Sequence, residues 1–168
     1  SDVLAFTYDA GDLLRSDDKG LSWLSVISNL PPDIDIKSIL NEDSVYFIAT
    51  ANHGLYKSSD HGLSWNAANT GLTSNNIRDI VRMGTRLFVS QATGGATFIS
   101  DDEGLTWTPS STGFQFAFAD KFFVDGSRIY VKSGYNIYYS DNDGASWDSI
   151  VRAGCPAGAG PDVIGRTG

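Results

Sequence analysis

Residues 16–23 read SDDKGLSW, and almost the same eight letters return three more times. They read SSDHGLSW at residues 58–65, SDDEGLTW at residues 100–107 and SDNDGASW at residues 140–147. All four tryptophans of the chain occupy the last position of these octets. A period of about 40 residues, with several strands in each unit, is typical of a propeller or a solenoid.

The third unit shows the strand pattern most clearly. Its predicted strands cover residues 77–82, 86–90 and 96–100, and a fourth opens at residues 106–108. Glycine-containing turns and the octet itself separate these strands. The other units align with it, with second strands at residues 3–6, 45–48 and 129–131 and third strands at residues 13–15, 55–57 and 137–139.

These strands are apolar on both sides more often than a half-exposed sheet allows, which indicates sheets that lie between two neighbours. Four-stranded sheets packed face to face around an axis are the blades of a propeller. We therefore predict an all-β chain with a single domain over residues 1–168, a β-propeller of about four four-stranded antiparallel blades. The octets would turn the chain between the third and fourth strands. A strand-based solenoid is the alternative, but its coils are usually about 20–30 residues long.

The two ends of the chain resemble parts of one blade. The first unit starts at its second strand, whereas residues 161–168, PDVIGRTG, read like a first strand and its turn. Residues 161–168 could complete the first blade of the same chain in a four-bladed ring. They could instead complete that of another chain in an eight-bladed ring, or the chain could be a slice of a longer propeller. Because unpaired end strands invite association, we favour a homo-oligomeric ring or a slice.

The octets follow the pattern Ser-x-Asp-x-Gly-x-Ser/Thr-Trp, and this pattern is similar to the Asp-box, or BNR repeat, of sialidases, sortilin-type receptors and xyloglucanases. The resemblance covers essentially the whole chain and implies a β-propeller. One departure is visible, because Asn142 stands where the other octets have aspartate. The residues at the structural positions of the motif are Ser16, Asp18, Gly20, Trp23, Ser58, Asp60, Gly62, Trp65, Ser100, Asp102, Gly104, Trp107, Ser140, Asn142, Gly144 and Trp147.

Each residue type of the octet suits a turn that holds the fold. Aspartate and asparagine side chains accept backbone N–H groups across a turn, and glycine adopts a positive φ without a steric clash. Each tryptophan can bury a large apolar area, worth roughly 2–3 kcal/mol. Calcium sites or catalytic carboxylates are the alternative interpretation, but a calcium loop needs more oxygen ligands than an octet supplies. We expect a structural turn, with no metal and no cofactor.

Composition limits the classes of partner. Twenty acidic residues against 12 basic ones give a formal net charge of −8, which disfavours nucleic acid and anionic lipid. No apolar run reaches the length of about 18 residues that membrane insertion requires. The given sequence shows no signal peptide, yet the resemblance implies an extracellular or cell-surface location. The single cysteine, Cys155, excludes an internal disulfide, and we expect a passive thiol.

The propeller leaves the face opposite the octets free for binding, and loops on a rigid scaffold often carry function. Asp, Asn, His and aromatic side chains in those loops suit sugars or peptide segments. Packing against the next blade is the alternative role for Phe114. The candidate ligand-binding residues are Asp9, Asp12, Asn52, His53, Asn69, Phe114, Tyr135 and Asn136.

Catalysis has little support in the sequence. A sialidase of the resembling type would need an arginine triad and a Phe/Tyr-Arg-Ile-Pro motif, and the chain contains no such motif. Asp9 and Asp12 are candidates for a xyloglucanase-like carboxylate pair only by default. We therefore assign no catalytic residue and expect a non-enzymatic recognition or scaffold module that binds carbohydrate or protein segments. The alternative is a fragment or relative of a glycoside hydrolase.

Overall fold

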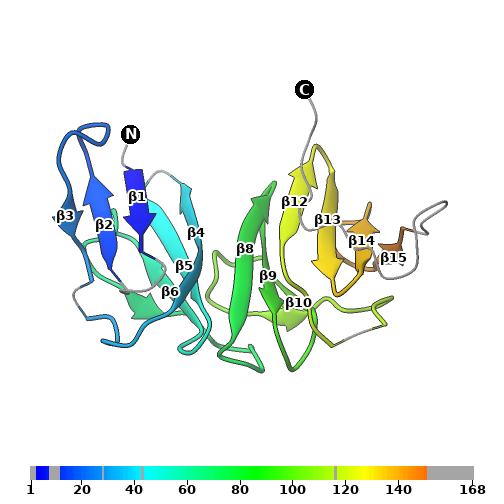
Figure 1. Ribbon diagram of the computed structural model, residues 1–168. Helices are drawn as coiled ribbons and strands as arrows, with labels where there is room; N and C mark the ends of the chain where they lie inside the picture. The colour runs from blue at the N-terminus through cyan, green and yellow to red at the C-terminus, as the bar shows by residue number, and fades with distance from the viewer. Residues whose placement is uncertain (1–2, 8–11, 28, 43, 116, 151–168) are drawn as a thin grey trace.

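The computed structural model describes residues 3–7, 12–27, 29–42, 44–115 and 117–150. These residues form fifteen strands in four antiparallel sheets, and none of them is helical (Figure 1). Among the described residues we accordingly find no apolar helix of the length that a membrane crossing requires.

Each sheet is one blade, with its strands hydrogen-bonded in chain order. Blade 1 contains β1 (Val3–Phe6), β2 (Leu13–Ser16) and β3 (Leu24–Ser25). Blade 2 contains β4 (Ile36–Glu42), β5 (Val45–Thr50), β6 (Leu55–Ser58) and β7 (Asn66–Ala67). Blade 3 contains β8 (Ile77–Met83), β9 (Arg86–Gln91), β10 (Thr97–Ser100) and β11 (Thr108–Pro109). Blade 4 contains β12 (Phe122–Asp125), β13 (Arg128–Ser133), β14 (Asn136–Ser140) and β15 (Asp148–Ser149).

The prediction of an all-β propeller with about four blades is confirmed. Blades 2, 3 and 4 have four strands, and blade 1 has three within the described residues. The predicted strand at residues 161–168 lies outside the described residues, so its pairing stays a prediction. The fourth strand of blade 3 begins at Thr108 and not at Thr106, because the N–H of Trp107 donates to the Thr70 carbonyl in the preceding loop, 2.9 Å away.

The first strands of blades 2 to 4 lie next to one another on the inside of the arc (Figure 1). β4 and β8 each begin with a shift of register against the next strand, between Ile36 and Ser38 and between Ile77 and Asp79. A bulge of this kind redirects the side chain of the extra residue. Those extra residues are Lys37 and Arg78.

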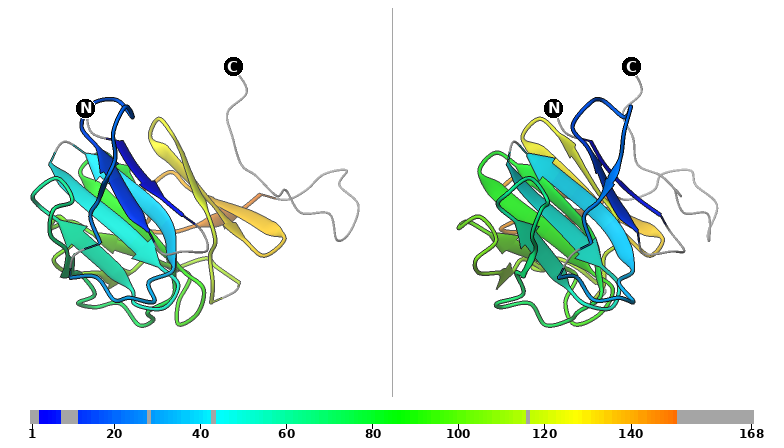
Figure 2. Two further views of the ribbon diagram at one scale, coloured as in Figure 1. Left: turned by 60° about the vertical axis from the view of Figure 1, so that its left-hand side comes forward. Right: turned by 90° about the vertical axis from the view of Figure 1, so that its left-hand side faces the viewer.

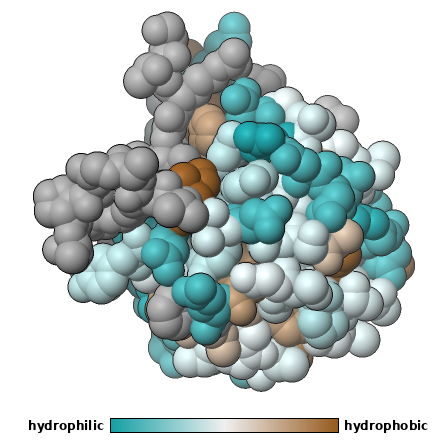
Figure 3. Space-filling model, turned by 90° about the vertical axis from the view of Figure 1, so that its right-hand side faces the viewer, coloured by the Kyte–Doolittle hydropathy of each residue, from teal (hydrophilic) through white to brown (hydrophobic). Residues whose placement is uncertain are grey.

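The hydrophobic core is divided among the blade boundaries. The sheets stack face against face (Figure 2), and a separate buried cluster fills each of the three boundaries. Trp65 belongs to the cluster between blades 1 and 2, Trp107 to that between blades 2 and 3, and Trp147 to that between blades 3 and 4. Seen from the side of β12–β15, the surface is mostly hydrophilic, with hydrophobic residues scattered across it (Figure 3).

Candidate functional site

The octets are closed by their own side chains. In the second octet, the Ser58 hydroxyl donates to Asp60 Oδ1 at 2.7 Å and accepts the N–H of Gly62 at 2.8 Å. The backbone N–H and hydroxyl of Ser64 donate to the two oxygens of Asp60 at 2.9 and 2.6 Å. The first and third octets repeat these bonds. The aspartate oxygens are therefore occupied inside the turn.

The same bonds set the acidity of the octet aspartates. The pKa of Asp60 falls to about 2, first because of the hydrogen bond from the Ser64 hydroxyl and then because of those from the Ser64 N–H and the Ser58 hydroxyl. The pKa values of Asp18 and Asp102 fall to about 2 for the equivalent reasons. A carboxyl group that acts as a general acid needs a raised pKa, whereas the pKa of these aspartates is lowered. Within the described ranges, no group of three or more His, Cys, Asp or Glu side chains is arranged to hold a metal ion.

The octet glycines have the positive φ that the sequence predicted, for example 82° at Gly62 and 79° at Gly104. The residue before each glycine also has a left-handed backbone conformation, with φ of 59° at His61 and 58° at Glu103. The sequence did not predict this conformation, because the residue type at this position varies among the octets. A Cβ on Gly104 would lie 2.7 Å from Cε1 of Phe47 in the preceding blade. The glycine is therefore required by the turn and also by the contact between blades.

Asn142 preserves most of the octet geometry. Its Oδ1 accepts from the Ser140 hydroxyl at 2.8 Å and from the Ser146 N–H at 3.0 Å, as the aspartates do. Its Nδ2 donates to the Ser146 hydroxyl at 2.9 Å, so this one hydrogen bond has the reverse direction. The fourth octet thus needs no carboxylate to close.

Two of the predicted binding residues join loops within blade 2. Asn52 accepts the N–H of Asp35 at 3.1 Å and donates to the Asp33 carbonyl at 2.6 Å. His53 Nε2 lies 2.9 Å from Oδ1 of Asp33. These side chains hold the loop before β4 against the loop between β5 and β6.

The other candidates do not converge with that pair. Asp12 is exposed, and its N–H donates to the Thr7 hydroxyl at 3.2 Å, while Asp9 lies outside the described residues. Asn69 uses its Oδ1 to accept the N–H of Leu55 at 2.7 Å, which fastens the loop after β7 to β6. Their role in binding stays a prediction.

In the loop between β11 and β12, Phe114 packs at ring-centroid distances of 4.5 Å from Tyr138 and 5.3 Å from Trp147 of blade 4. This is the packing role that the sequence offered as the alternative. Asn136 pairs with Ser133 at the start of β14. Tyr135 is 69% exposed at the tip between β13 and β14, which leaves its ring available to a ligand.

A group of charged residues that sequence reasoning missed lies where the first strands begin. We call Lys37, Arg78, Asp79, Asp120 and Lys121 the inner-strand cluster. Asp79 is 5% exposed, and its Oδ1 lies 3.1 Å from Lys121 Nζ, which also donates to the Lys37 carbonyl at 3.4 Å. Arg78 Nη1 lies 3.8 Å from Oδ1 of Asp120. The cluster lies on the face opposite the octets, because each first strand starts at that face.

Two hollows adjoin this cluster. The smaller has a volume of about 170 Å³ and is lined by Lys37, Arg78, Asp120 and Lys121. The larger, about 570 Å³, lies between β1 and β4, and its lining residues are Leu4, Ala5, Phe6, Lys37, Ser38, Ile39, Asn41 and Lys121. The one sequence signal for the cluster was the basic residue that follows the first isoleucine in both β4 and β8, at Lys37 and Arg78.

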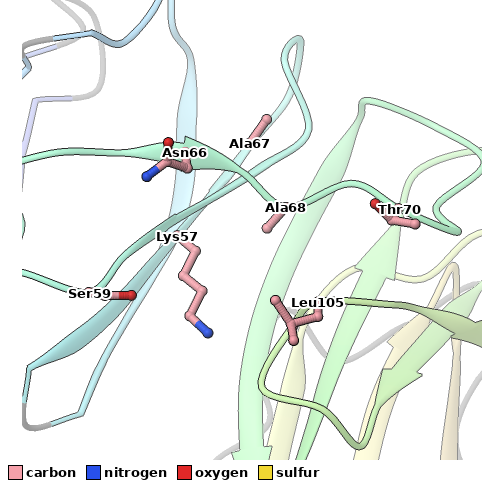
Figure 4. A pocket seen from close by; sticks show the side chains of 8 residues that line it. Lys57, Ser59, Asn66, Ala67, Ala68, Thr70 and Leu105 are labelled. Atoms are coloured by element: carbon pink, nitrogen blue, oxygen red, sulfur yellow. The ribbon is translucent and has the colours of Figure 1, made fainter.

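A third hollow of about 320 Å³ lies between blades 2 and 3, where Lys57, Ala68 and Leu105 point toward it (Figure 4). The ammonium group of Lys57 donates to the Glu103 carbonyl at 2.6 Å. The hollow thus adjoins the third octet and lies away from the inner-strand cluster.

Solved structures share this architecture at low sequence identity. YCF48 bound to D1 peptide is 15% identical with a TM-score of 0.64, and the match covers 83% of this chain and 48% of that one. The GH74 xyloglucanase from Xanthomonas campestris is 17% identical with a TM-score of 0.69, over 95% of this chain and 30% of that one. The GH74 enzyme from Niastella koreensis is 20% identical with a TM-score of 0.65, over 89% and 26%. These matches establish the fold alone.

The chain spans less than half the length of each of these structures. No curated protein matches the sequence significantly. A family model described as the DUF6242 beta propeller domain matches residues 3–108 and again residues 30–159. The chain belongs to the DUF6242 beta-propeller domain family.

Proposed function

We propose that this propeller is a non-enzymatic recognition module that binds a protein segment with side chains of both charges at the inner-strand cluster. The observation that carries the proposal is the smaller hollow, which is lined by Lys37, Lys121 and the ion pair of Arg78 with Asp120. The Arg78 and Asp120 side chains are 47% and 31% exposed, so a ligand can reach both.

Ion pairs at such a surface are weak and exchange partners readily. A segment that presents a carboxylate to Arg78 and an amine to Asp120 replaces one exposed pair by two, and it gains orientation from the planar guanidinium group. Neutral oligosaccharides cannot make this exchange. YCF48, which shares the fold, has been solved with a bound peptide, and this supports a peptide ligand by analogy.

A glycoside hydrolase is the competing proposal. It needs two carboxyl groups across a cleft, one of them with a raised pKa. The octet aspartates have lowered pKa values, because their carboxylate oxygens already accept hydrogen bonds within the turns. The GH74 enzymes share the fold, but fold alone does not carry activity. We therefore assign no catalytic residue.

Two further assignments belong to the same proposal. The octets act as Asp-boxes of the BNR type, which is supported by the repeated bonds from serine and threonine to Asp18, Asp60 and Asp102. An extracellular or cell-surface location accords with the resemblance to receptor and hydrolase propellers. Detection of the full-length protein in washed intact cells by a labelled antibody would check the location.

Binding can be tested with an immobilised array of 15-residue peptides that carry lysine and glutamate at varied spacing. We expect wild-type protein to bind a subset of them, and binding should weaken strongly as salt rises from about 50 to about 500 mM. Arg78→Ala should lose most of the signal because it removes the guanidinium group from the hollow. Lys19→Asn is the matched control, since Lys19 is an exposed cation with positive φ on the octet face.

Equal binding by the Arg78→Ala variant and the wild type would place the ligand elsewhere. Turnover of xyloglucan or of a panel of aryl glycosides well above the blank would favour the hydrolase instead. Binding of neutral oligosaccharides with no dependence on salt would replace the peptide by a carbohydrate.

A further inference from the structure

The outer rim of the boundary between blades 2 and 3 departs from the repeat. The second residue of the octet is Ser59 in blade 2 and aspartate in the other three blades. In those blades the aspartate lies beside an arginine: Asp17 beside Arg15, Asp101 beside Arg86 and Asp141 beside Arg128. The octet of blade 2 therefore lacks the carboxylate that neutralises a cation in the other blades.

Lys57 is the cation at this place in blade 2, because it holds in β6 the position that Arg15 holds in β2. Its ammonium group donates to the Glu103 carbonyl at 2.6 Å, which uses one of its three N–H groups. The Glu103 carboxylate is itself bound by Arg82 through two hydrogen bonds, of 3.0 and 2.8 Å. Lys57 therefore has N–H groups that can donate to the carboxylate of a ligand.

The hollow of about 320 Å³ lies beside Lys57 at this rim (Figure 4). Ser59 and Thr70 line it with polar side chains, whereas Ala68 and Leu105 line it with apolar ones. Leu105 is 67% exposed, so a ligand can reach its side chain. A hollow with one cation and an apolar wall suits an acidic side chain that has an apolar neighbour.

The edge of blade 2 is open beside the hollow, since β7 is the last strand of its sheet. Ala67 pairs with Tyr56, and the next residue, Ala68, donates its N–H to the Leu55 carbonyl at 2.9 Å. Because hydrogen-bonded and non-hydrogen-bonded pairs alternate along an antiparallel ladder, the N–H and C=O of Ala67 point away from β6. In blade 3 the same position is Pro109, which has no N–H to donate. Blade 2 can therefore accept a further strand where blade 3 cannot.

We propose that this rim binds an extended segment of a partner protein, which adds to the edge of β7 and places an acidic side chain on Lys57. The partner residue opposite Ala67 exchanges two main-chain hydrogen bonds with it, and such bonds supply affinity in strand addition. The charge of Lys57 supplies the specificity, because the octet of its own blade offers no carboxylate at Ser59.

The alternation of side chains along an extended segment defines the order of residues in the ligand. The residue opposite Ala67 points to the same side of the sheet as Ala67, whereas the residues before and after it point toward blade 3 and the hollow. One of these two carries the carboxylate for Lys57, and the other carries an apolar side chain that packs on Leu105. The ligand thus has an acidic and an apolar residue two positions apart.

Fluorescence anisotropy tests the proposal with labelled short peptides of threonine and valine. One pair of peptides carries glutamate and leucine two positions apart, in the two possible orders, and a matched pair carries glutamine in place of glutamate. We expect the wild type to bind at least one glutamate peptide saturably, and about fivefold or more tighter than its glutamine counterpart. The site does not depend on the ligand of the inner-strand cluster, because Arg78→Ala should bind these peptides as the wild type does.

Three variants copy residues that blade 3 has at the equivalent positions, so a propeller blade tolerates them: Lys57→Ile, Ser59→Asp and Ala67→Pro. Lys57→Ile should bind the glutamate and glutamine peptides equally, because the ammonium group is gone. Ser59→Asp should weaken the glutamate peptide about fivefold or more, because the new carboxylate neutralises Lys57 as Asp17 does Arg15. Ala67→Pro should weaken both peptides about tenfold or more, because the edge loses its N–H donor.

Matched controls make the same changes away from the hollow. Ser25→Pro places proline at the position in blade 1 that Ala67 holds in blade 2, and it should leave binding unchanged. Lys19→Asn removes a cation of the first octet and should also bind as the wild type does.

Equal binding of the glutamate and glutamine peptides by the wild type would overturn the role of Lys57, and unchanged binding by Ala67→Pro would overturn strand addition. No binding by the wild type at up to roughly 100 µM would overturn the site as a whole. Loss of these peptides in Arg78→Ala would move them to the inner-strand cluster and overturn the rim site. Loss of only the peptides with mixed charge in Arg78→Ala would leave both proposals standing separately.

Discussion

Asp79 on β8 accepts a hydrogen bond from the backbone N–H of Phe122 on β12, at 2.9 Å and across a blade boundary. The same carboxylate accepts from the Ser38 hydroxyl on β4 at 2.6 Å and lies 3.1 Å from the ammonium group of Lys121. One carboxylate, only 5% exposed, therefore joins the first strands of three blades. Buried ionised groups persist only where such partners compensate their desolvation.

Removal of the Asp79 carboxylate should strongly lower the free energy of unfolding. Asp79→Ala leaves the Phe122 N–H and the Ser38 hydroxyl without their acceptor, and we expect the free energy of unfolding to fall by about 2–4 kcal/mol in urea titrations. Asp79→Asn keeps an acceptor oxygen and should cost less. Asp17→Ala is the control, since Asp17 is 68% exposed, and it should stay within about 0.5 kcal/mol. Equal effects of Asp79→Ala and Asp17→Ala would contradict this role.

The sequence predicted the blades because the octets recur and because apolar residues fill their strands. It also predicted the positive φ of the octet glycines, which follows from local turn chemistry. It missed Asp79, because the partners of this residue lie 41 and 43 positions away and no short motif links them. The predicted binding residues were chosen loop by loop, and Asn52 and Asn69 proved to be tied to the backbone of their own blade.

The geometry at Asn142 predicts that substitutions in the octets lower the melting temperature by graded amounts. Asp60→Asn should lower the melting temperature only slightly, because Oδ1 can still accept from Ser58 and Ser64 as Oδ1 of Asn142 does in the fourth octet. Asp60→Ala should lower it by several degrees, because the turn loses both carboxylate oxygens, which accept from Ser58 and Ser64. Asn142→Asp should raise it at neutral pH by restoring a carboxylate. Differential scanning calorimetry measures all three, and equal melting temperatures for Asp60→Asn and Asp60→Ala would contradict the series.

Calcium should leave these melting temperatures unchanged. Ser64 and Ser58 already occupy the oxygens of Asp60, and a calcium ion needs about six to eight oxygen ligands. Scans with millimolar calcium and with a chelator should therefore superimpose. A rise of several degrees with calcium would mean that the octets open to coordinate it.

Acid should unfold the protein through the octets. The pKa of Asp18, Asp60 and Asp102 is about 2 in the folded chain against an ordinary value of 3.8. A lowered folded-state pKa contributes stability that is present above the unfolded value and is lost as pH falls through the folded one. We expect stability to decline from about pH 4 to about pH 2. The triple variant Asp18→Asn, Asp60→Asn, Asp102→Asn should decline less steeply in urea titrations across that range, and an unchanged slope would exclude these groups.

A comparison of Gly113 with Gly84 tests how tightly the blade boundaries are packed. Both have positive φ, 99° at Gly113 and 60° at Gly84. A Cβ on Gly113 would lie 1.9 Å from the carbonyl oxygen of Trp147, whereas a Cβ on Gly84 would meet no atom within 4 Å. Gly84→Ala should therefore cost only the left-handed backbone conformation, about 1–2 kcal/mol. Gly113→Ala must also move Trp147 and should cost roughly 3 kcal/mol or more in urea titrations. Similar losses of unfolding free energy for the two variants would mean that the backbone around Trp147 can move at little energetic cost.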